Sequence, residues 1–371
     1  MRIAVFVANF DPGGVFRINS QLVDALRQKG HQVQFISATN RPQVREHDNE
    51  GQFSLGASST IRSLPQMRSV LMRGDYEIVI VSQLFLGLVA LVARPWKSIT
   101  ALLLVEHSSL EYWKESPKIK DRLVLLLSKV LLGKADQIAA VSKETTKSIN
   151  EQFRSLRRPA VYLPNPVLNG NEPVFKEEEK RVVVRSGIVC AGRLVPGKRV
   201  PDIIHAFSQV ASEVSDDLTI LGDGPEMKTC VNLVNDLGLD NRVFFKGFVE
   251  NVTEFFQVAK CLVLASESEG LPTVLIEALA HGCEVVSTDC PTGPSEILEK
   301  GKFGMLVPIG DRTQLAKCML EALHSEKRIH GLAKHLDQFQ LSVSTSRYES
   351  ICYEAIAFRL NSNKKRNSMK S

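Results

Sequence analysis

The stretch Ser266-Glu-Ser-Glu-Gly-Leu-Pro-Thr-Val-Leu-Ile-Glu-Ala-Leu-Ala-His-Gly282 decides how the rest of the chain is interpreted. It follows an apolar run at 261–265, which is typical of a buried strand. Pro272 suits the first turn of a helix, because the N–H that proline lacks would have had no partner there. Apolar residues then recur at helical spacing until Gly282 stops the helix. The stretch therefore predicts a strand, an acidic loop and a helix.

Two carboxylates frame this helix, Glu269 just before it and Glu277 two turns further on. The unbonded N–H groups and the positive dipole end of the helix favour an anion beside the loop that holds Glu269. An anion site with a carboxylate on each side suits a ligand that is both phosphorylated and rich in hydroxyl groups. A nucleotide sugar is such a ligand.

Length and composition predict a globular protein of two domains, because 371 residues exceed a typical single domain. The seven cysteines are scattered without a C-x-x-C pair, which argues against a disulfide framework or a zinc site and for a reducing compartment. Residues 1–7 read as a buried strand rather than a signal peptide. The longest apolar stretch, residues 78–93, is shorter than the ~18–20 residues that span a bilayer. We therefore expect a cytoplasmic protein.

Strands and helices alternate through both halves of the chain, which predicts an α/β protein of two doubly wound, Rossmann-like domains facing each other across a cleft. The first domain is expected at residues 1–167 and the second at 184–341, with a linker at 168–183 between them. A C-terminal helix at about 342–360 is expected to pack back on the first domain, followed by a polar, basic tail at 361–371 that lacks stable structure.

The individual strands follow from short apolar runs. Those of the first domain are predicted at 2–8, 32–37, 78–81, 102–106, 137–141 and 160–163, and those of the second at 188–191, 218–221, 243–245, 262–265 and 284–287. Residues 38–60 are polar and predict a long surface loop, which is uncommon unless it is functional or mobile.

A second motif, Cys190-Ala-Gly-Arg-Leu-Val-Pro-Gly-Lys-Arg199, runs from a strand through a loop into a helix. Gly192 and Lys198 have the spacing of a P-loop, but Arg199 stands where a P-loop needs Ser or Thr to hold Mg²⁺. Arg193 offers a planar fork of donors to a diphosphate and Lys198 adds a point charge, although two solvated surface cations remain the alternative. Because the sequence also lacks a D-x-D pair, we expect fixed cations rather than a metal to neutralise phosphate.

Taken together, these motifs resemble family 4 of the retaining GT-B glycosyltransferases, also called glycosyl transferases group 1. In the second half the resemblance rests on Ala191-Gly-Arg-Leu…Lys198, Gly222-Asp-Gly-Pro225, Lys246-Gly-Phe-Val249, Glu269-x₇-Glu277, Gly304-x-Leu-Val-Pro308 and Gly310-Asp311. In the first half it rests on Gly13-Gly14, Gly30-His31-Gln-Val33, Val141-Ser142 and Asn165-Pro166. The resemblance covers residues 1–325, is most specific in the second half, and implies the GT-B fold.

The resemblance also implies a role for each matching residue. The donor diphosphate would be bound by Gly14, Arg193, Lys198, Thr273 and Val274, the ribose and base by Glu277, Phe248 and Val249, and the donor sugar by Glu269, Gly270 and Leu271. His107 and Glu269 are the implied catalytic positions. His107 would contact the sugar or stabilise positive charge at the anomeric carbon, with a structural loop histidine as the alternative. Glu106 beside it has no assigned role.

The implied enzyme is a retaining, metal-independent glycosyltransferase without a cofactor. It would move a hexose or N-acetylhexosamine from a nucleotide diphosphate sugar, UDP by family frequency, to a saccharide or lipid-linked saccharide in polysaccharide or glycolipid biosynthesis. A nucleotide-sugar epimerase of the same fold and a non-catalytic nucleotide-sugar binding protein remain alternatives. A dehydrogenase is disfavoured, because Pro12-Gly-Gly-Val-Phe-Arg17 is not the G-x-G-x-x-G that a dinucleotide needs after the first strand.

Charge is uneven along the chain. Residues 1–165 hold 22 Lys and Arg against 14 Asp and Glu, a net of +8, while the remainder is at −3. This favours an acidic partner or an anionic membrane surface, and no nucleic acid is expected. The basic, aromatic segment 112–122 leads into the apolar residues 123–132. Either it contacts the inner face of the membrane peripherally, or it packs as a helix on its own sheet with a solvated face.

Overall fold

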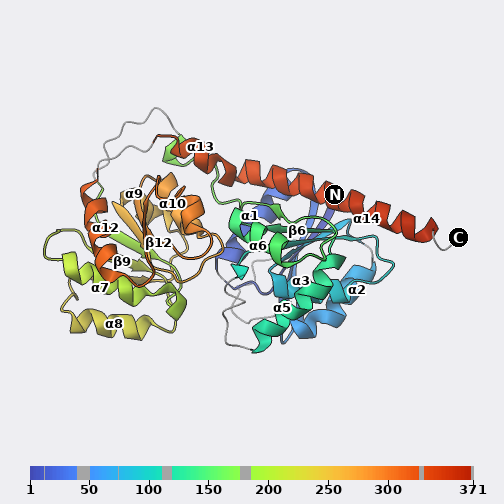
Figure 1. Cartoon of the computed structure of the whole chain (residues 1–371), viewed down its shortest axis with the longest axis horizontal. Coiled ribbons are helices and arrows are strands. Elements are labelled where there is room, and N and C mark those ends of the chain that lie inside the picture. The colour runs from blue at the N-terminus through green and yellow to red at the C-terminus, as the bar shows by residue number, and fades with distance from the viewer. Residues whose placement is uncertain are drawn as a thin grey trace. The chain divides into compact units, whose positions relative to one another are not determined.

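The computed structural model divides the chain into two compact units (Figure 1). It describes residues 1–11, 13–39, 51–73, 75–110, 119–175, 185–325 and 330–368, without the side chains of 119, 120 and 365–368. The first unit comprises Met1–Pro166 together with Phe339–Ser371, and the second comprises Val167–Gln338.

The first unit is built on a sheet whose described strands all pair in parallel, in the order β3-β2-β1-β4-β5-β6-β7. Their bounds are β1 Arg2–Val7, β2 Gln32–Thr39, β3 Gln52–Ala57, β4 Ile78–Ser82, β5 Ala101–Glu106, β6 Gln137–Ala140 and β7 Val161–Tyr162. The central strands β4 and β5 are buried along their whole length. A parallel strand with helices on both faces requires such a continuous apolar run, which explains why the sequence predicted these strands.

Helices cover both faces of this sheet. They are α1 Gly14–Gln28, α2 Leu64–Arg73, α3 Leu84–Ala93, α5 Ile119–Leu131, α6 Lys143–Gln152 and α14 Leu341–Ser368. Helix α3 packs between α2 and α5, whereas α1 packs against α14. The long α14, red in Figure 1, thus belongs to the first unit although it ends the chain.

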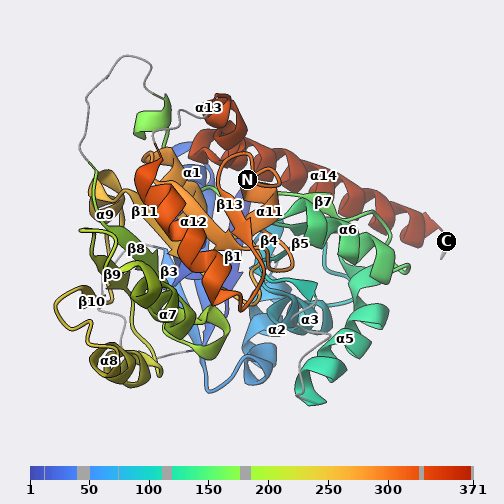
Figure 2. The ribbon, with the colours of Figure 1, turned by 60° about the vertical axis from the view of Figure 1, so that its left-hand side comes forward.

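The second unit repeats the plan with a parallel sheet in the order β10-β9-β8-β11-β12-β13 (Figure 2). Its strands are β8 Ile188–Ala191, β9 Leu218–Leu221, β10 Val243–Gly247, β11 Cys261–Leu264, β12 Glu284–Thr288 and β13 Met305–Val307. Its helices are α7 Val200–Val210, α8 Met227–Asp236, α9 Thr253–Val258, α10 Thr273–Ala280, α11 Pro294–Ile297, α12 Arg312–His324 and α13 Leu332–Leu336. Helix α7 packs between α8 and α12, and α10 packs against α9, α11 and α13.

Two strands were missed from the sequence. Residues 38–60 were predicted as one loop, but β3 lies within them and pairs with β2 at the edge of the sheet. An edge strand is only partly buried, so polar residues such as Gln52 and Ser54 do not prevent it. The three-residue β13 is too short to show a pattern, and its pairing with β12 defines it. Residues 40–50 lie outside the described residues.

The predicted linker and tail are both wrong in part. Residues 168–175 fold with the second unit, since Leu168 is buried and the carboxylate of Glu172 accepts the N–H groups of Asn169 and Gly170 at 2.8 and 2.9 Å. Helix α14 continues to Ser368 instead of ending near 360. No glycine or proline interrupts it, and the buried guanidinium of Arg359 donates to the carbonyl of Ser98 at 2.6 and 3.1 Å.

Candidate active site

The order of strands in the second unit reverses between β8 and β11, which pair with each other although β9 follows β8 in sequence. Loops that leave the carboxyl ends of two such strands diverge, and ligands of doubly wound sheets bind in the crevice between them. The loop after β8 carries Lys198, and the loop after β11 carries Glu269. The two strongest sequence motifs therefore meet at this reversal.

A network that the sequence did not predict fixes these two loops together. The N–H of Glu267 donates to the carbonyl of Gly197 at 2.9 Å, and Arg199 bridges the carboxylates of Glu267 and Asp202 at 2.7 and 2.5 Å. Asp202 also accepts from Arg312 at 2.6 Å. Arg199 adopts a left-handed backbone conformation, with a φ of 49°, which is uncommon for a residue other than glycine. The only signal in the sequence was its position next to Lys198.

Lys198 and Glu269 form an ion pair, and the hydroxyl of Ser266 donates to the same carboxylate oxygen at 2.6 Å. The hydroxyl of Thr292 donates to the backbone carbonyl of Glu269, and this bond fixes the loop after β11. An ammonium carries three donors, so Lys198 keeps two for a ligand after contacting Glu269. The pair thus presents a cation for phosphate and a carboxylate oxygen for hydroxyl groups side by side.

Helix α10 begins directly after this loop, with Pro272 at its start and no side chain capping it. Its first N–H groups, at Thr273 and Val274, therefore contribute positive partial charge beside Gly270 and Leu271. Gly293 lies close to the turn at Gly270–Pro272. A Cβ there would lie 2.5 Å from the proline ring of Pro272, and its φ of 91° favours glycine.

The remaining predicted residues of the second unit lie on the same edge of the sheet in different environments. Glu277 is buried in α10. Arg193, just after β8, is exposed and forms no ion pair with a described residue. Phe248 and Val249 follow β10, and the carbonyl of Gly247 accepts the N–H of Gly222 at 2.7 Å, which joins the loops after β9 and β10. Lys198 and Glu269 are thus the pair that the structure brings into direct contact.

His107 and Gly14 belong to the first unit. His107 follows β5, and burial lowers the pKa of its imidazole to about 4, so it is neutral at pH 7. Its Nε2 atom is buried and has no hydrogen-bond partner among the described residues. Such an atom is costly to leave unpaired. A neutral imidazole can accept or donate a hydrogen bond but does not itself carry charge.

Glu106, which had no role from the sequence, holds the loop of His107 in place. Its carboxylate accepts the N–H of Leu84 at 2.7 Å and that of Ser108 at 2.6 Å, so it satisfies the start of α3. Burial raises the pKa of Glu106 to about 7. Its position is therefore a structural one at the carboxyl end of β5.

Gly14 is the first residue of α1, and a Cβ built there would meet no atom within 4 Å. Its φ is not in the left-handed region either. The fold of the first unit therefore does not require glycine at this position, and a requirement would have to come from a ligand.

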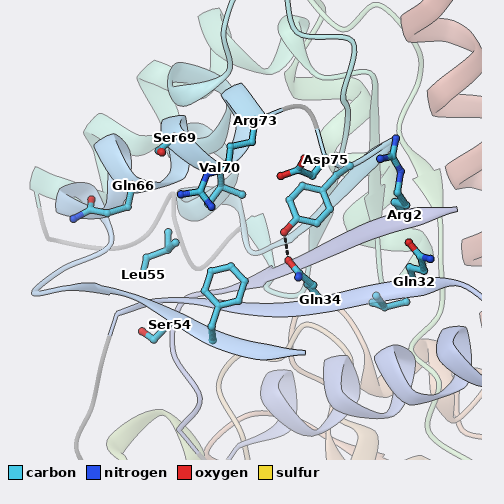
Figure 3. Close-up of a pocket in the computed structure, with 13 residues that line it drawn as sticks. Arg2, Gln32, Gln34, Ser54, Leu55, Gln66, Ser69, Val70, Arg73 and Asp75 are labelled. Atoms are coloured by element: carbon cyan, nitrogen blue, oxygen red, sulfur yellow. Dashed lines mark hydrogen bonds between the residues drawn. The ribbon is translucent and has the colours of Figure 1, made fainter. Parts of the chain in front are cut away.

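One hollow among the described residues contains none of the predicted site residues. It has a volume of about 760 Å³ and lies between α2 and strands β2 and β3, near the amino ends of the parallel strands (Figure 3). Figure 3 shows Arg2, Arg73 and Asp75 around it. The hydroxyl of Tyr76, which also lines the hollow, donates a hydrogen bond to the side-chain oxygen of Gln34. Ligands of doubly wound sheets bind at the carboxyl ends instead. The candidate site is accordingly placed at Lys198 and Glu269, beyond the carboxyl ends of β8 and β11.

Comparison with known proteins places these motifs in a family. The model of Glycosyltransferase Family 4 matches residues 12–167, and the model of Glycosyl transferases group 1 matches residues 185–325. The chain belongs to glycosyltransferase family 4. The two models together cover both units and contain every predicted site residue.

Individual relatives agree with this assignment. N-acetyl-alpha-D-glucosaminyl L-malate synthase of Bacillus anthracis is 33% identical over 164 residues, which cover 43% of each chain, so the match spans less than half of that relative. GalNAc-alpha-(1->4)-GalNAc-alpha-(1->3)-diNAcBac-PP-undecaprenol alpha-1,4-N-acetyl-D-galactosaminyltransferase of Campylobacter jejuni is 26% identical over 339 residues, 88% of this chain and 90% of the relative. HepE of Anabaena, solved in complex with UDP, has a TM-score of 0.75 at 18% identity and covers 95% of this chain and 99% of its own. The predicted GT-B fold is confirmed.

Proposed function

We propose that this protein transfers a hexose or N-acetylhexosamine from a UDP-sugar to a saccharide or lipid-linked saccharide, with retention at the anomeric carbon and without a metal. The observation that carries the proposal is the contact between Lys198 and Glu269 at the reversal of strand order in the second unit. The contact joins a cation, which would bind phosphate, to a carboxylate, which would bind sugar hydroxyls, and this combination supports a sugar diphosphate as the ligand.

The chemistry follows from the charge that develops when the bond between sugar and diphosphate breaks. Negative charge grows on the leaving diphosphate, and preorganised donors stabilise it most where they need not reorganise. Lys198 is held in place by Glu269, and the N–H groups at the start of α10 provide further donors for the diphosphate. Arg193, which is exposed, supplies the second cation. Lys198 and the N–H groups of α10 are the fixed donors that support the metal-independent proposal.

The remaining roles are those that the family resemblance implies. The carboxylate of Glu269 would accept hydrogen bonds from hydroxyls of the donor sugar, and that of Glu277 from hydroxyls of the ribose. Phe248 and Val249 would line the base. Gly14 and His107 of the first unit would contact the phosphates and the sugar. A neutral His107 would act through hydrogen bonding, since its pKa of about 4 keeps it uncharged at pH 7.

The acceptor is proposed from the relatives and from the surface of the first unit. The Campylobacter jejuni relative is named for a diphospho-undecaprenol acceptor and matches along most of both chains. We infer a role in glycolipid or polysaccharide biosynthesis, in the cytoplasm or at the inner face of the membrane. In the described part of the chain, no helix is both long and apolar enough to cross a bilayer.

A thermal-shift panel of UDP-, GDP-, ADP- and CMP-sugars tests the donor, repeated on Glu277→Ala. One nucleotide should raise the melting temperature of the native protein clearly more than the others, and Glu277→Ala should lose that shift. No shift with any nucleotide would contradict the proposal. Nucleotide release with extracted lipid-linked acceptors, with and without a chelator, then separates the alternatives. An epimerase converts donor without acceptor, and a binding protein releases no nucleotide.

A further inference from the structure

Helix α5 of the first unit presents an apolar stripe to solvent. Leu123, Leu126, Leu127 and Val130 are 52%, 60%, 43% and 70% exposed. Their positions i, i+3, i+4 and i+7 place them on one side of the helix. The four side chains are aliphatic, and no polar residue lies within the stripe.

The opposite side of the same helix is buried and partly polar. Asp121, Val124 and Ser128 are buried, and the hydroxyl of Ser128 donates to the carbonyl of Val124 at 2.7 Å. Helix α5 packs beside α3 (Figure 1), and the burial of these three residues shows that this side of α5 faces the protein. A helix that only covers its own sheet would turn its leucines to the sheet and its serine and aspartate to water. An exposed apolar stripe of this kind marks a surface that contacts something else.

Basic side chains border the stripe. Arg122 and Lys129 are exposed, and their spacing of seven residues puts both along the same edge of it. Lys134 is exposed just beyond the helix. Residues 122–134 contain no aspartate or glutamate. An apolar strip edged by cations complements an anionic bilayer, where aliphatic side chains enter the headgroup region and cations contact lipid phosphates.

A second copy of the chain fits the stripe less well. In a symmetric dimer with antiparallel α5 helices, equal edges meet, so that Arg122 and Lys129 of one copy would face the same cations of the other. The excess of 22 basic over 14 acidic residues in residues 1–165 adds to this repulsion. The same charges attract an anionic membrane.

We propose that α5 lies in the surface of an anionic bilayer, with Leu123, Leu126, Leu127 and Val130 among the lipid headgroups and Arg122 and Lys129 on the phosphates. This inference rests on the proposed function in one respect only: membrane binding would hold the enzyme where a lipid-linked acceptor is found. Binding itself is measurable without donor or acceptor. The predicted segment 112–118, with Lys114 and Lys118, lies outside the described residues, and the side chain of Lys120 is not described.

The test is co-sedimentation of the full-length protein with vesicles of phosphatidylglycerol and phosphatidylcholine, and with vesicles of phosphatidylcholine alone. Leu126→Gln/Val130→Gln should weaken binding to the anionic vesicles by about tenfold or more, because two aliphatic side chains leave the bilayer. The matched control is Ile61→Gln/Met72→Gln, which removes two side chains of the same unit that are 61% and 64% exposed. It should bind as the native protein does.

The charge is tested separately with Lys129→Glu against Lys147→Glu, a change at another exposed lysine, on α6. Lys129→Glu should weaken binding about fivefold or more and Lys147→Glu much less. Equal binding by the stripe and control variants, or no preference for anionic vesicles, would overturn the proposal. So would concentration-dependent dimers that Leu126→Gln/Val130→Gln abolishes in the absence of vesicle binding. Thermal shift by the donor should be unchanged in every variant, which separates this inference from the proposed function.

Discussion

Glu269 holds Lys198 through its charge while its loop is fixed by Ser266 and Thr292. The proposed role of this carboxylate concerns the sugar, whereas that of Lys198 concerns the diphosphate. If the two roles are distinct, removing the charge of Glu269 should weaken sugar transfer without weakening nucleotide binding.

Glu269→Gln should lower the turnover number about a hundredfold, because a charged acceptor for the donor sugar is lost. Its affinity for the nucleoside diphosphate should stay the same or increase, since Lys198 no longer faces a competing carboxylate. Steady-state kinetics and calorimetric titration measure the two effects. A parallel loss of both would show that Glu269 acts only by positioning Lys198.

Gly14→Ala gives a second test at the scale of one residue. The structure leaves open space around a Cβ at this position, so the free energy of unfolding should stay within about 0.5 kcal/mol of the native value or rise slightly. Turnover should nevertheless fall, because the methyl group would meet the donor phosphates. Unchanged turnover would remove Gly14 from the site.

Residue roles could be predicted only where a motif was visible. Lys198 and Glu269 were found because each lies in a short motif with a recognisable strand, loop and helix order. Asp202 and Arg312 were missed, since they are separated by more than a hundred residues and no local pattern relates them. Arg199 was noticed only as a departure from the P-loop, whereas the structure makes it the bridge between the two loops.

At the scale of elements, β5 ends in a carboxylate that binds the start of α3. Glu106 is buried, and burial raises the pKa of its carboxyl from 4.5 to about 7. Folding therefore favours the protonated form. The stability that this contributes is fully present below pH 4.5 and is lost as the pH rises through about 7.

Glu106→Gln removes this titration. The free energy of unfolding of the native protein, relative to the variant, should fall by up to about 3 kcal/mol between about pH 5 and about pH 8. Urea denaturation at the two pH values measures the change, and Glu144→Gln, on an exposed residue of α6, is the matched control. Native and Glu106→Gln proteins whose stabilities change in parallel with pH would contradict the assigned environment of Glu106.

Elements were predictable in proportion to how fully they are buried. β4, β5, β8 and β9 are continuous apolar runs and were located to within a residue or two. The edge strand β3 and the short β13 are defined by pairing with neighbours, which the local sequence does not show. The last turns of α14 are polar and were therefore predicted as a tail. Arg359 and Asn363 bond there to the carbonyl of Ser98, which is too distant in sequence for a local pattern to show the contact.

At the scale of the whole molecule, the chain contains two units of one architecture. The proposed roles are divided between these two units. The second unit carries most of the residues that we propose bind the donor, including Lys198, Glu269 and Glu277, and its motifs are the most specific in the sequence. The first unit carries the basic excess and the exposed stripe of α5. The sequence predicted this division through charge and motif density, but only the structure shows which side of α5 is exposed.

The central claim is that Lys198 binds the diphosphate of the donor in the second unit. Calorimetric titration with UDP, of the native protein, Lys198→Ala and the exposed-surface control Lys228→Ala, tests it most directly. The dissociation constant for UDP should rise about tenfold or more in Lys198→Ala, because a charge-assisted contact to phosphate is lost, and stay unchanged in Lys228→Ala. UDP affinity in Lys198→Ala equal to that of the native protein, with the fold intact, would contradict the claim.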